Sequence, residues 1–240
     1  MRQLNWLRVC IAMAIAVGAL LPRTVGAAEP VKHVGIYVEP FYAAAPTREE
    51  APRVGVGGPY SALLASTNPE NILAVQEMIR SKPALTTPMT MMVLAIRLYD
   101  TGKRDDAVFW FYAAKDRYVT LREVIVADAP QLAQSSDAMN SFNALLGPII
   151  NGYAFCDVSR QQALRAKALD WVEHNAYQAI FLEQLPARGP DRKALLTAAI
   201  AKARENAEKE RAYLADPANL QALKDGRNKN DMDSKFCWAD

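Results

Sequence analysis

The chain has 240 residues, and its 28 lysines and arginines nearly balance its 26 aspartates and glutamates. A chain of this length can bury one sizeable core as a single domain. A net charge this close to neutral argues against nucleic acid and against an anionic membrane surface as partners.

The first 27 residues have the three parts of a cleavable secretory signal peptide. Arg2 and Arg8 form a positively charged start, and residues 9–21 are an unbroken run of apolar and small side chains. This run is shorter than the roughly 20 residues that a membrane span requires. We therefore expect cleavage after Ala27 or one residue later, export to the periplasm or secretion, and no membrane insertion of the mature chain.

Signal removal changes both the charge and the cysteine count. The three arginines of the signal leave with it, so that 25 basic residues face 26 acidic ones. Cys10 also leaves, and Cys156 and Cys237 remain as the one possible pair in an oxidising compartment. The sequence predicts a disulfide between them, which closes a loop of about 80 residues and contributes roughly 4–5 kcal/mol in the chain-entropy model. The alternative is two unpaired buried thiols.

The mature chain opens with an extended segment and then a long irregular one. Residues 31–38 are rich in β-branched and aromatic side chains, which indicates a strand-like arm that ends at Pro40. Residues 41–59 contain three prolines and three glycines, which predicts an irregular loop that is either functional or loosely ordered. We assign residues 28–60 to this arm and loop, and residues 61–240 to a helical domain with a C-terminal tail.

From residue 68 onward the pattern is helical. Asn68-Pro69 and Thr87-Pro88 each combine a capping side chain with a proline that fits the first helical turn. Apolar spacing, glycines and prolines then predict helices at about 69–82, 88–101, 107–124, 131–146, 160–185, 192–214 and 218–224. The helix at 131–146 is expected to break at Gly147-Pro148. The predicted fold class is all-α, a single helical domain of six to seven helices with an extended N-terminal arm.

The last predicted helices differ from the others in their surface. The helix at 192–214 is poor in large apolar residues, and Glu205 and Lys209 stand four apart, which favours an exposed helix packed along a narrow alanine seam. After residue 224 we expect a solvated turn that leads to Cys237. Phe236 and Trp238 flank this cysteine and are expected to pack the tail onto the body.

Residues 91–114 carry one recognisable motif. A first helix with Ala95 meets a turn at Gly102, and a second helix contains Ala107, Phe111 and Ala114. This pattern resembles a single tetratricopeptide or Sel1-like helical hairpin, in which small residues allow close approach and aromatic residues fill the groove beside them. No second copy follows at the repeat period, and a single repeat cannot form the concave surface of a solenoid. The resemblance implies a helix pair and a role in protein binding.

An exported helical protein with this hairpin is also similar to periplasmic proteins encoded beside type VI secretion effectors. Some of those are immunity proteins, which bind a toxic enzyme and block it. The resemblance implies that this chain binds another protein and neutralises a secreted toxic effector. We expect aromatic side chains of the arm and the hairpin to contact the partner, namely Tyr37, Phe41, Tyr42, Trp110 and Tyr112.

The sequence contains no assembled catalytic set, so a non-catalytic protein is expected. Asp170, Glu173 and His174 can share one helix face, but the second histidine of a helical zinc site is missing. The glycine-rich stretch at residues 55–58 lacks the lysine of a phosphate loop. We expect no cofactor and no metal. Two alternatives stay open, namely a periplasmic enzyme or ligand carrier with a pocket between helices, and a cell-envelope assembly factor.

Overall fold

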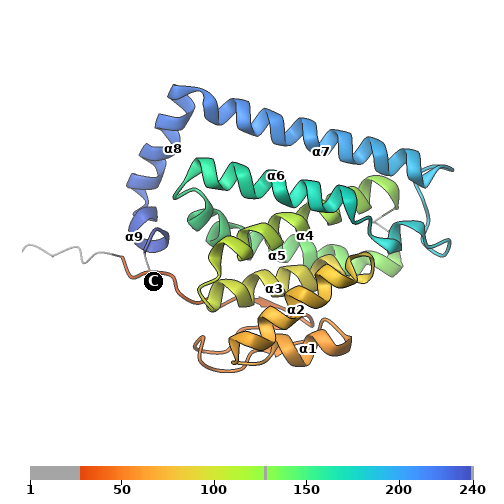
Figure 1. Ribbon diagram of the computed structural model, residues 1–240, viewed down its shortest axis with the longest axis horizontal. Helices are drawn as coiled ribbons and strands as arrows, with labels where there is room; N and C mark the ends of the chain where they lie inside the picture. Colours follow the sequence, from red (N-terminus) through yellow and green to blue (C-terminus); the bar gives the residue numbers. More distant parts are fainter. Residues whose placement is uncertain (1–27, 127–128, 239–240) are drawn as a thin grey trace, which may run out of the picture.

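The computed structural model describes residues 28–126 and 129–238, and its architecture is all-α, as predicted (Figure 1). The signal peptide expected at residues 1–27 lies outside the described residues. Three short strands come first, namely β1 (Tyr37–Val38), β2 (Tyr42–Ala43) and β3 (Arg53–Val54). The helices follow in the order α1 (Gly58–Leu64), α2 (Pro69–Ser81), α3 (Pro88–Asp100), α4 (Arg104–Val124), α5 (Ala133–Ala154), α6 (Val158–His174), α7 (Arg192–Ala215), α8 (Pro217–Lys229) and α9 (Met232–Phe236). Three 3-10 turns connect them, namely η1 (Pro83–Leu85), η2 (Pro130–Leu132) and η3 (Gln178–Phe181).

The α3–α4 hairpin forms the centre of the molecule. Every residue of α3 is buried, and α4 contacts α3, α5, α6 and α7. Gly102 closes the turn between the two helices with a φ of +81°, a conformation that glycine adopts without steric cost. Ala95 and Ala107 are fully buried at the helix contact, as close approach requires. The helix pair that the sequence predicted at residues 91–114 is therefore present.

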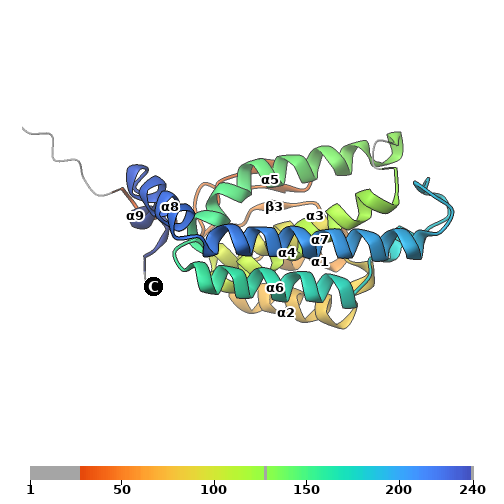
Figure 2. The same ribbon diagram turned by 90° about the horizontal axis from the view of Figure 1, so that it is seen from above.

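Other helices cover this hairpin on opposite sides. In Figure 1, α1 and α2 lie below the hairpin, while α6 and α7 lie above it. Seen from above in Figure 2, α7 runs between α5 and α6. Among the described residues, no helix combines the length and the apolar character that a membrane crossing requires.

The N-terminal arm packs onto the same core. Val34, Ile36 and Val38 are buried, and the backbone N–H of Val34 donates to the buried carboxylate of Asp100. The segment predicted as an irregular loop contains β2 and β3, which pair with β1 of the arm in a three-stranded antiparallel sheet of order β1-β2-β3, and the start of α1. The strand-like character of residues 31–38 indicated β1, whereas β2 and β3 are two residues long, too short to show an alternating pattern.

Capping residues predicted several helix starts correctly. The side chain of Asn68 accepts a hydrogen bond from the N–H of Glu70, and that of Thr87 accepts one from Thr90. Asp191 accepts bonds from two N–H groups at the start of α7. These contacts satisfy donors that the first helical turn leaves free.

Two predicted helix ends were wrong. α5 does not break at Gly147-Pro148 but continues to Ala154. A proline inside a helix removes one backbone hydrogen bond, and burial of Leu146 and Ile150 on either side offsets that loss. α6 ends at His174 rather than near residue 185, because the carbonyl of Asn175 turns inward to accept a hydrogen bond from Arg117.

The tail after residue 224 is also more regular than expected. α8 continues to Lys229, and α9 follows in place of a solvated turn. Phe236 packs against Gly152, where any added side chain would lie 2.6 Å from the phenyl ring. The aromatic anchoring of the tail is thus confirmed for Phe236.

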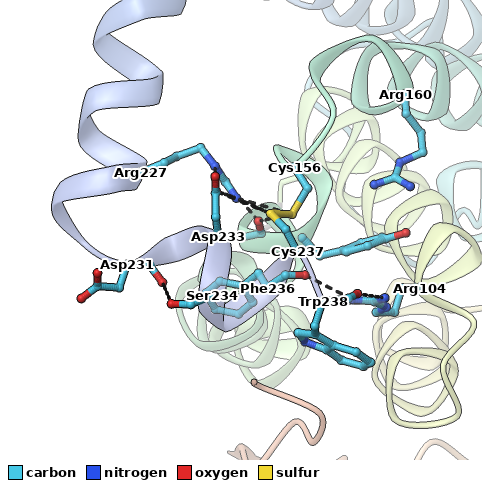
Figure 3. The surroundings of a disulfide bond; sticks show 12 residues. Arg104, Cys156, Arg160, Arg227, Asp231, Asp233, Ser234, Phe236, Cys237 and Trp238 are labelled. Carbon is cyan, nitrogen blue, oxygen red and sulfur yellow. Dashed lines mark hydrogen bonds and ion pairs between the residues drawn. A yellow bond between two sulfur atoms is a disulfide. The ribbon is translucent and has the colours of Figure 1, made fainter. Parts of the chain in front are cut away.

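The predicted disulfide between Cys156 and Cys237 is present and joins the end of α5 to the tail, with 5.5 Å between the two Cα atoms. Figure 3 shows the guanidinium of Arg227 reaching both sulfur atoms and the carboxylate of Asp233. Arg227 also donates to the carbonyl of Gly152. The disulfide therefore sits within a set of contacts that holds α8 and α9 against α5.

Candidate functional site

The aromatic residues predicted to bind a partner fall into two groups. Tyr37 is 62% exposed, and Phe41 is partly buried beside it in the arm. Tyr42, Trp110 and Tyr112 are buried and pack in the core. A buried ring cannot contact a protein that docks on this surface, so a partner-binding role stays a prediction for Tyr37 and Phe41.

The acidic group on α6 forms ion pairs with α7. Asp170, Glu173 and His174 do lie together, with one ligand atom of each within 4.8 Å of the others. All three are exposed, and the guanidinium of Arg204 on α7 forms ion pairs with both carboxylates. We conclude that these residues join the C-terminal end of α6 to α7.

A buried ion pair ties the arm to the hairpin. Arg97 donates to the carboxylate of Asp100 at 2.9 Å and to the backbone carbonyls of Leu64 and Ser66. The Asp100 carboxylate also accepts from the N–H of Val34 at 2.8 Å. Every contact of this pair goes to structural groups, and the side chains are almost completely buried. The pair organises the fold and does not face a ligand.

His33 belongs to the same cluster. Its Nδ1 lies 3.2 Å from the Asp100 carboxylate, and its Nε2 lies 2.9 Å from the carbonyl of Ala45. Both partners accept hydrogen bonds, so the doubly protonated ring fits this position. The hydrogen bond to Asp100 is the main cause that raises the pKa of His33 above its ordinary value, and partial burial opposes it.

Arg117 on α4 is buried without a carboxylate beside it. Its guanidinium donates to three backbone carbonyls, those of Pro83, Thr86 and Asn175. Burial lowers the pKa of Arg117 to about 10. The ring of Trp171 lies 4.6 Å from the guanidinium carbon, which adds a cation–π contact. This arginine connects the η1 turn, α4 and the end of α6, so its role is structural.

A groove lies between α6 and α7 on the described surface. It encloses about 600 Å³ and is partly open to solvent. Most of its surface is apolar, although its rim carries both positive and negative side chains. The groove is lined by Gln161, Gln162, Arg165, Ala166 and Leu169 of α6, and by Arg204, Glu205, Ala207, Glu208, Glu210 and Arg211 of α7.

A chain of polar contacts runs from the groove into the core and joins four helices. The Glu210 carboxylate on α7 accepts from Gln161 Nε2 on α6 at 2.9 Å, and the same Nε2 donates to the hydroxyl of Tyr112 on α4. The Tyr112 hydroxyl donates to Asn151 Oδ1 on α5 at 2.9 Å. Burial raises the pKa of Tyr112 to about 12, so the phenol remains protonated and can donate. We call these four residues the polar relay.

A second contact lies next to the polar relay. Arg165 on α6 forms an ion pair with the buried carboxylate of Asp116 on α4. Burial raises the pKa of Asp116, while the Arg165 guanidinium opposes that shift. The charge of Arg165 is therefore already engaged with Asp116 beneath the groove.

The groove combines an apolar lining with a few polar groups. Gln161 is fully buried, and its Oε1 has no hydrogen-bond partner among the described residues. No serine or cysteine lines the groove beside a base, as nucleophilic catalysis would need. An apolar lining with a few polar groups can hold an apolar stem and fix a polar end.

The chain has a relative of similar length. An uncharacterized protein of Haemophilus influenzae is 32% identical over 210 residues, which cover 88% of this chain and 81% of that protein. The chain belongs to the family of that protein. No family model matches the chain, and no solved structure matches it. The description of the H. influenzae relative names no activity, ligand or partner, so the proposals below rest on this chain's own residues.

Proposed function

We propose that this protein is an exported, non-catalytic helical protein that binds another protein through the groove between α6 and α7. The observation that carries the proposal is the groove itself, which is apolar, rimmed by charges and partly open to solvent. Interfaces combine an apolar centre with a polar rim in the same way. The signal-like sequence at residues 1–27 and the disulfide support a site of action outside the cytoplasm, in the periplasm or beyond.

We propose further that the partner is a secreted toxic effector, which this protein neutralises as an immunity protein. The support is the resemblance of the α3–α4 hairpin region to exported immunity proteins. In the structure, α4 of this hairpin contacts both α6 and α7, the two helices that line the groove. A cell-envelope assembly factor would use the same groove and differ only in the identity of its partner.

Affinity purification tests the binding proposal. The tagged protein is purified from periplasmic extract beside Ala207→Trp, which fills the groove with a large side chain on an exposed helix. We expect mass spectrometry to identify a protein that the wild type retains and Ala207→Trp loses. The immunity role further requires that the wild type, and not Ala207→Trp, restores growth of cells that express this partner. A protein that is always solitary, or a partner that both baits retain equally, contradicts the proposal.

A ligand carrier is the second candidate function. The feature that favours it is the polar relay, which contains the buried and incompletely bonded amide of Gln161. Native mass spectrometry of protein purified from periplasm would then show a bound small molecule. Such a molecule, lost in Ala207→Trp, would favour the carrier over the protein-binding role.

A further inference from the structure

The Glu210 carboxylate stands out among the charges of the groove. The cations next to it in sequence are engaged elsewhere, since Lys209 pairs with Glu205 and Arg211 pairs with Glu208. Arg165 across the groove pairs with Asp116. Among the described residues, no cation forms an ion pair with Glu210, and Gln161 Nε2 supplies the hydrogen bond it accepts. Glu210 is thus a half-buried negative group without a positive partner.

A second polar atom beside Glu210 also lacks a partner. The amide of Gln161 is oriented by its two hydrogen bonds, because Nε2 donates both to Glu210 and to the Tyr112 hydroxyl. Reversing the amide would place its oxygen against the Glu210 carboxylate, which is repulsive. Its Oε1 therefore remains without a donor in a side chain that is fully buried. This oxygen lies below the surface, so Gln161 positions the Glu210 carboxylate and does not itself reach a ligand.

The Glu210 carboxylate and the apolar lining together define a ligand. A primary ammonium or a guanidinium carries several N–H donors and a positive charge, which match a carboxylate. The methylene stem of lysine or arginine packs well along apolar surface while its charged end meets polar groups. Ala166, Leu169 and Ala207 supply such surface in the groove.

We propose that the groove receives a lysine or arginine side chain of the partner protein, and that its charged end pairs with the Glu210 carboxylate, which Gln161 holds in place. This inference rests on the proposed protein-binding function and names the chemistry of the contact. A free diamine has the same chemistry, but small ligands are usually enclosed on most of their surface. The groove is partly open to solvent, which suits a side chain that arrives from a protein surface.

The subsite can be tested directly with small probes. Nα-acetyl-lysine N-methylamide is titrated into the isotope-labelled, disulfide-bonded protein and followed by two-dimensional NMR. The matched neutral probe is Nα-acetyl-norleucine N-methylamide, which has a similar stem and no charge. We expect the lysine probe to shift amide signals of α6 and α7, with an affinity at least about tenfold higher than that of norleucine. Equal shifts from both probes, or none from either, would overturn the proposal.

Variants locate the contact on Glu210. Glu210→Gln keeps the shape and the hydrogen bond from Gln161 but removes the charge, and we expect it to weaken the lysine probe by about tenfold. The control is Glu205→Gln on the same helix and in the same groove, whose charge already pairs with Lys209; its affinity should change by less than about twofold. Ala207→Trp should abolish binding by filling the groove. Equal binding by Glu210→Gln and wild type contradicts the assignment of Glu210.

A third probe, cadaverine, distinguishes a free diamine from a protein side chain as the source of the charged group. Affinity purification with wild type and Glu210→Gln distinguishes failure of the cation contact from failure of the protein-binding function. If cadaverine binds about tenfold more tightly than the lysine probe, the ligand is a free diamine and the proposed source is overturned. If the partner protein is retained by wild type and Glu210→Gln alike, the cation contact fails while the protein-binding function stands. If the lysine probe binds through Glu210 but no partner is found, the binding subsite stands and the function fails.

Discussion

The helices α3 and α7 show how differently two parts of this fold are held. All residues of α3 are buried, from Pro88 to Asp100. In α7 the buried residues are few, and two of the four are alanines, namely Ala199, Ile200, Ala203 and Leu214. Because apolar burial provides most of the stabilising free energy, α3 contributes far more per residue than α7. The core therefore depends on extensive apolar burial, whereas the wall of the groove formed by α7 does not.

The weakly buried helix is also the one that forms a wall of the groove. α7 contacts α4 and α6 but is otherwise exposed, and α8 continues from its end. Segments with few buried apolar contacts open locally at a lower free energy than the core. The well-packed α3–α4 hairpin therefore forms a stable base of the groove. The less buried α7 forms a wall of the groove that can adjust to a partner.

The largest expected effect comes from breaking the buried ion pair at the end of α3. Asp100→Asn leaves the guanidinium of Arg97 buried without a counter-charge, and it weakens the contacts to Val34 and His33. We expect a loss of about 3–5 kcal/mol in the free energy of unfolding, measured in urea. The control is Glu205→Gln on α7, where an exposed pair is broken and the urea midpoint should not shift. Equal shifts for both variants would remove the distinction between the two helices.

The same Leu→Ala truncation in α3 and in α7 tests how much side-chain packing stabilises each helix. Leu94 in α3 is fully buried among other core residues, while Leu214 near the end of α7 is 8% exposed. Leu94→Ala should lower the free energy of unfolding by about 3–4 kcal/mol. Leu214→Ala should lower it by about 2 kcal/mol or less, because a site near the surface can relax. Chemical denaturation of both variants measures the difference. A larger loss for Leu214→Ala would show that α7 is a core element.

Removing the disulfide should lower the free energy of unfolding by an intermediate amount. Replacing Cys156 and Cys237 with serine opens the link between α5 and the tail. We expect about 2–4 kcal/mol less stability, because the unfolded chain gains freedom. Thermal unfolding of oxidised and double-serine protein measures the change, and thiol labelling of the denatured oxidised protein should find neither cysteine free. Two labelled thiols would contradict the link itself.

The smallest predicted effect is a pH dependence at His33. Its folded-state pKa is raised above 6.5, chiefly by the hydrogen bond to Asp100. The protonated ring thus contributes stability that is fully present below pH 6.5 and is lost as the pH rises through the folded pKa. The difference in unfolding free energy between wild type and His33→Gln should shrink as the pH rises from about 5.5 to about 8.5. A difference that stays constant with pH would assign no role to the charge.

Local signals in the sequence predicted much of this fold, including α7. Asn68, Thr87 and Asp191 act through neighbours within three residues, so their capping roles could be read from the chain. The alanine-rich pattern at residues 192–214 likewise predicted an exposed helix with a narrow seam. Pro148 was misinterpreted because burial around it outweighs the local preference of proline.

The groove could not be predicted in the same way. Along the sequence, 49 residues separate Tyr112 from Gln161, and 49 separate Gln161 from Glu210. Only tertiary packing brings these side chains together. On the sequence, Gln161 and Glu210 look like ordinary polar positions of a solvated helix. Tyr112 was noticed as an aromatic residue, but its hydroxyl matters in the structure through the polar relay and not through an exposed ring. The ion pairs around Glu210 also depend on side chains of three helices, α4, α6 and α7.

Native-state hydrogen exchange tests the contrast between the inner hairpin and the outer helix most directly. Amides of α3 and α4 should exchange only through global unfolding, with a free energy that matches the value from denaturation. Amides in the middle of α7 should exchange through local opening at a clearly lower free energy, and the partner protein or the lysine probe should slow them. Equal protection of α3 and α7, unchanged by either ligand, would contradict the account of a stable core that carries an adjustable groove wall.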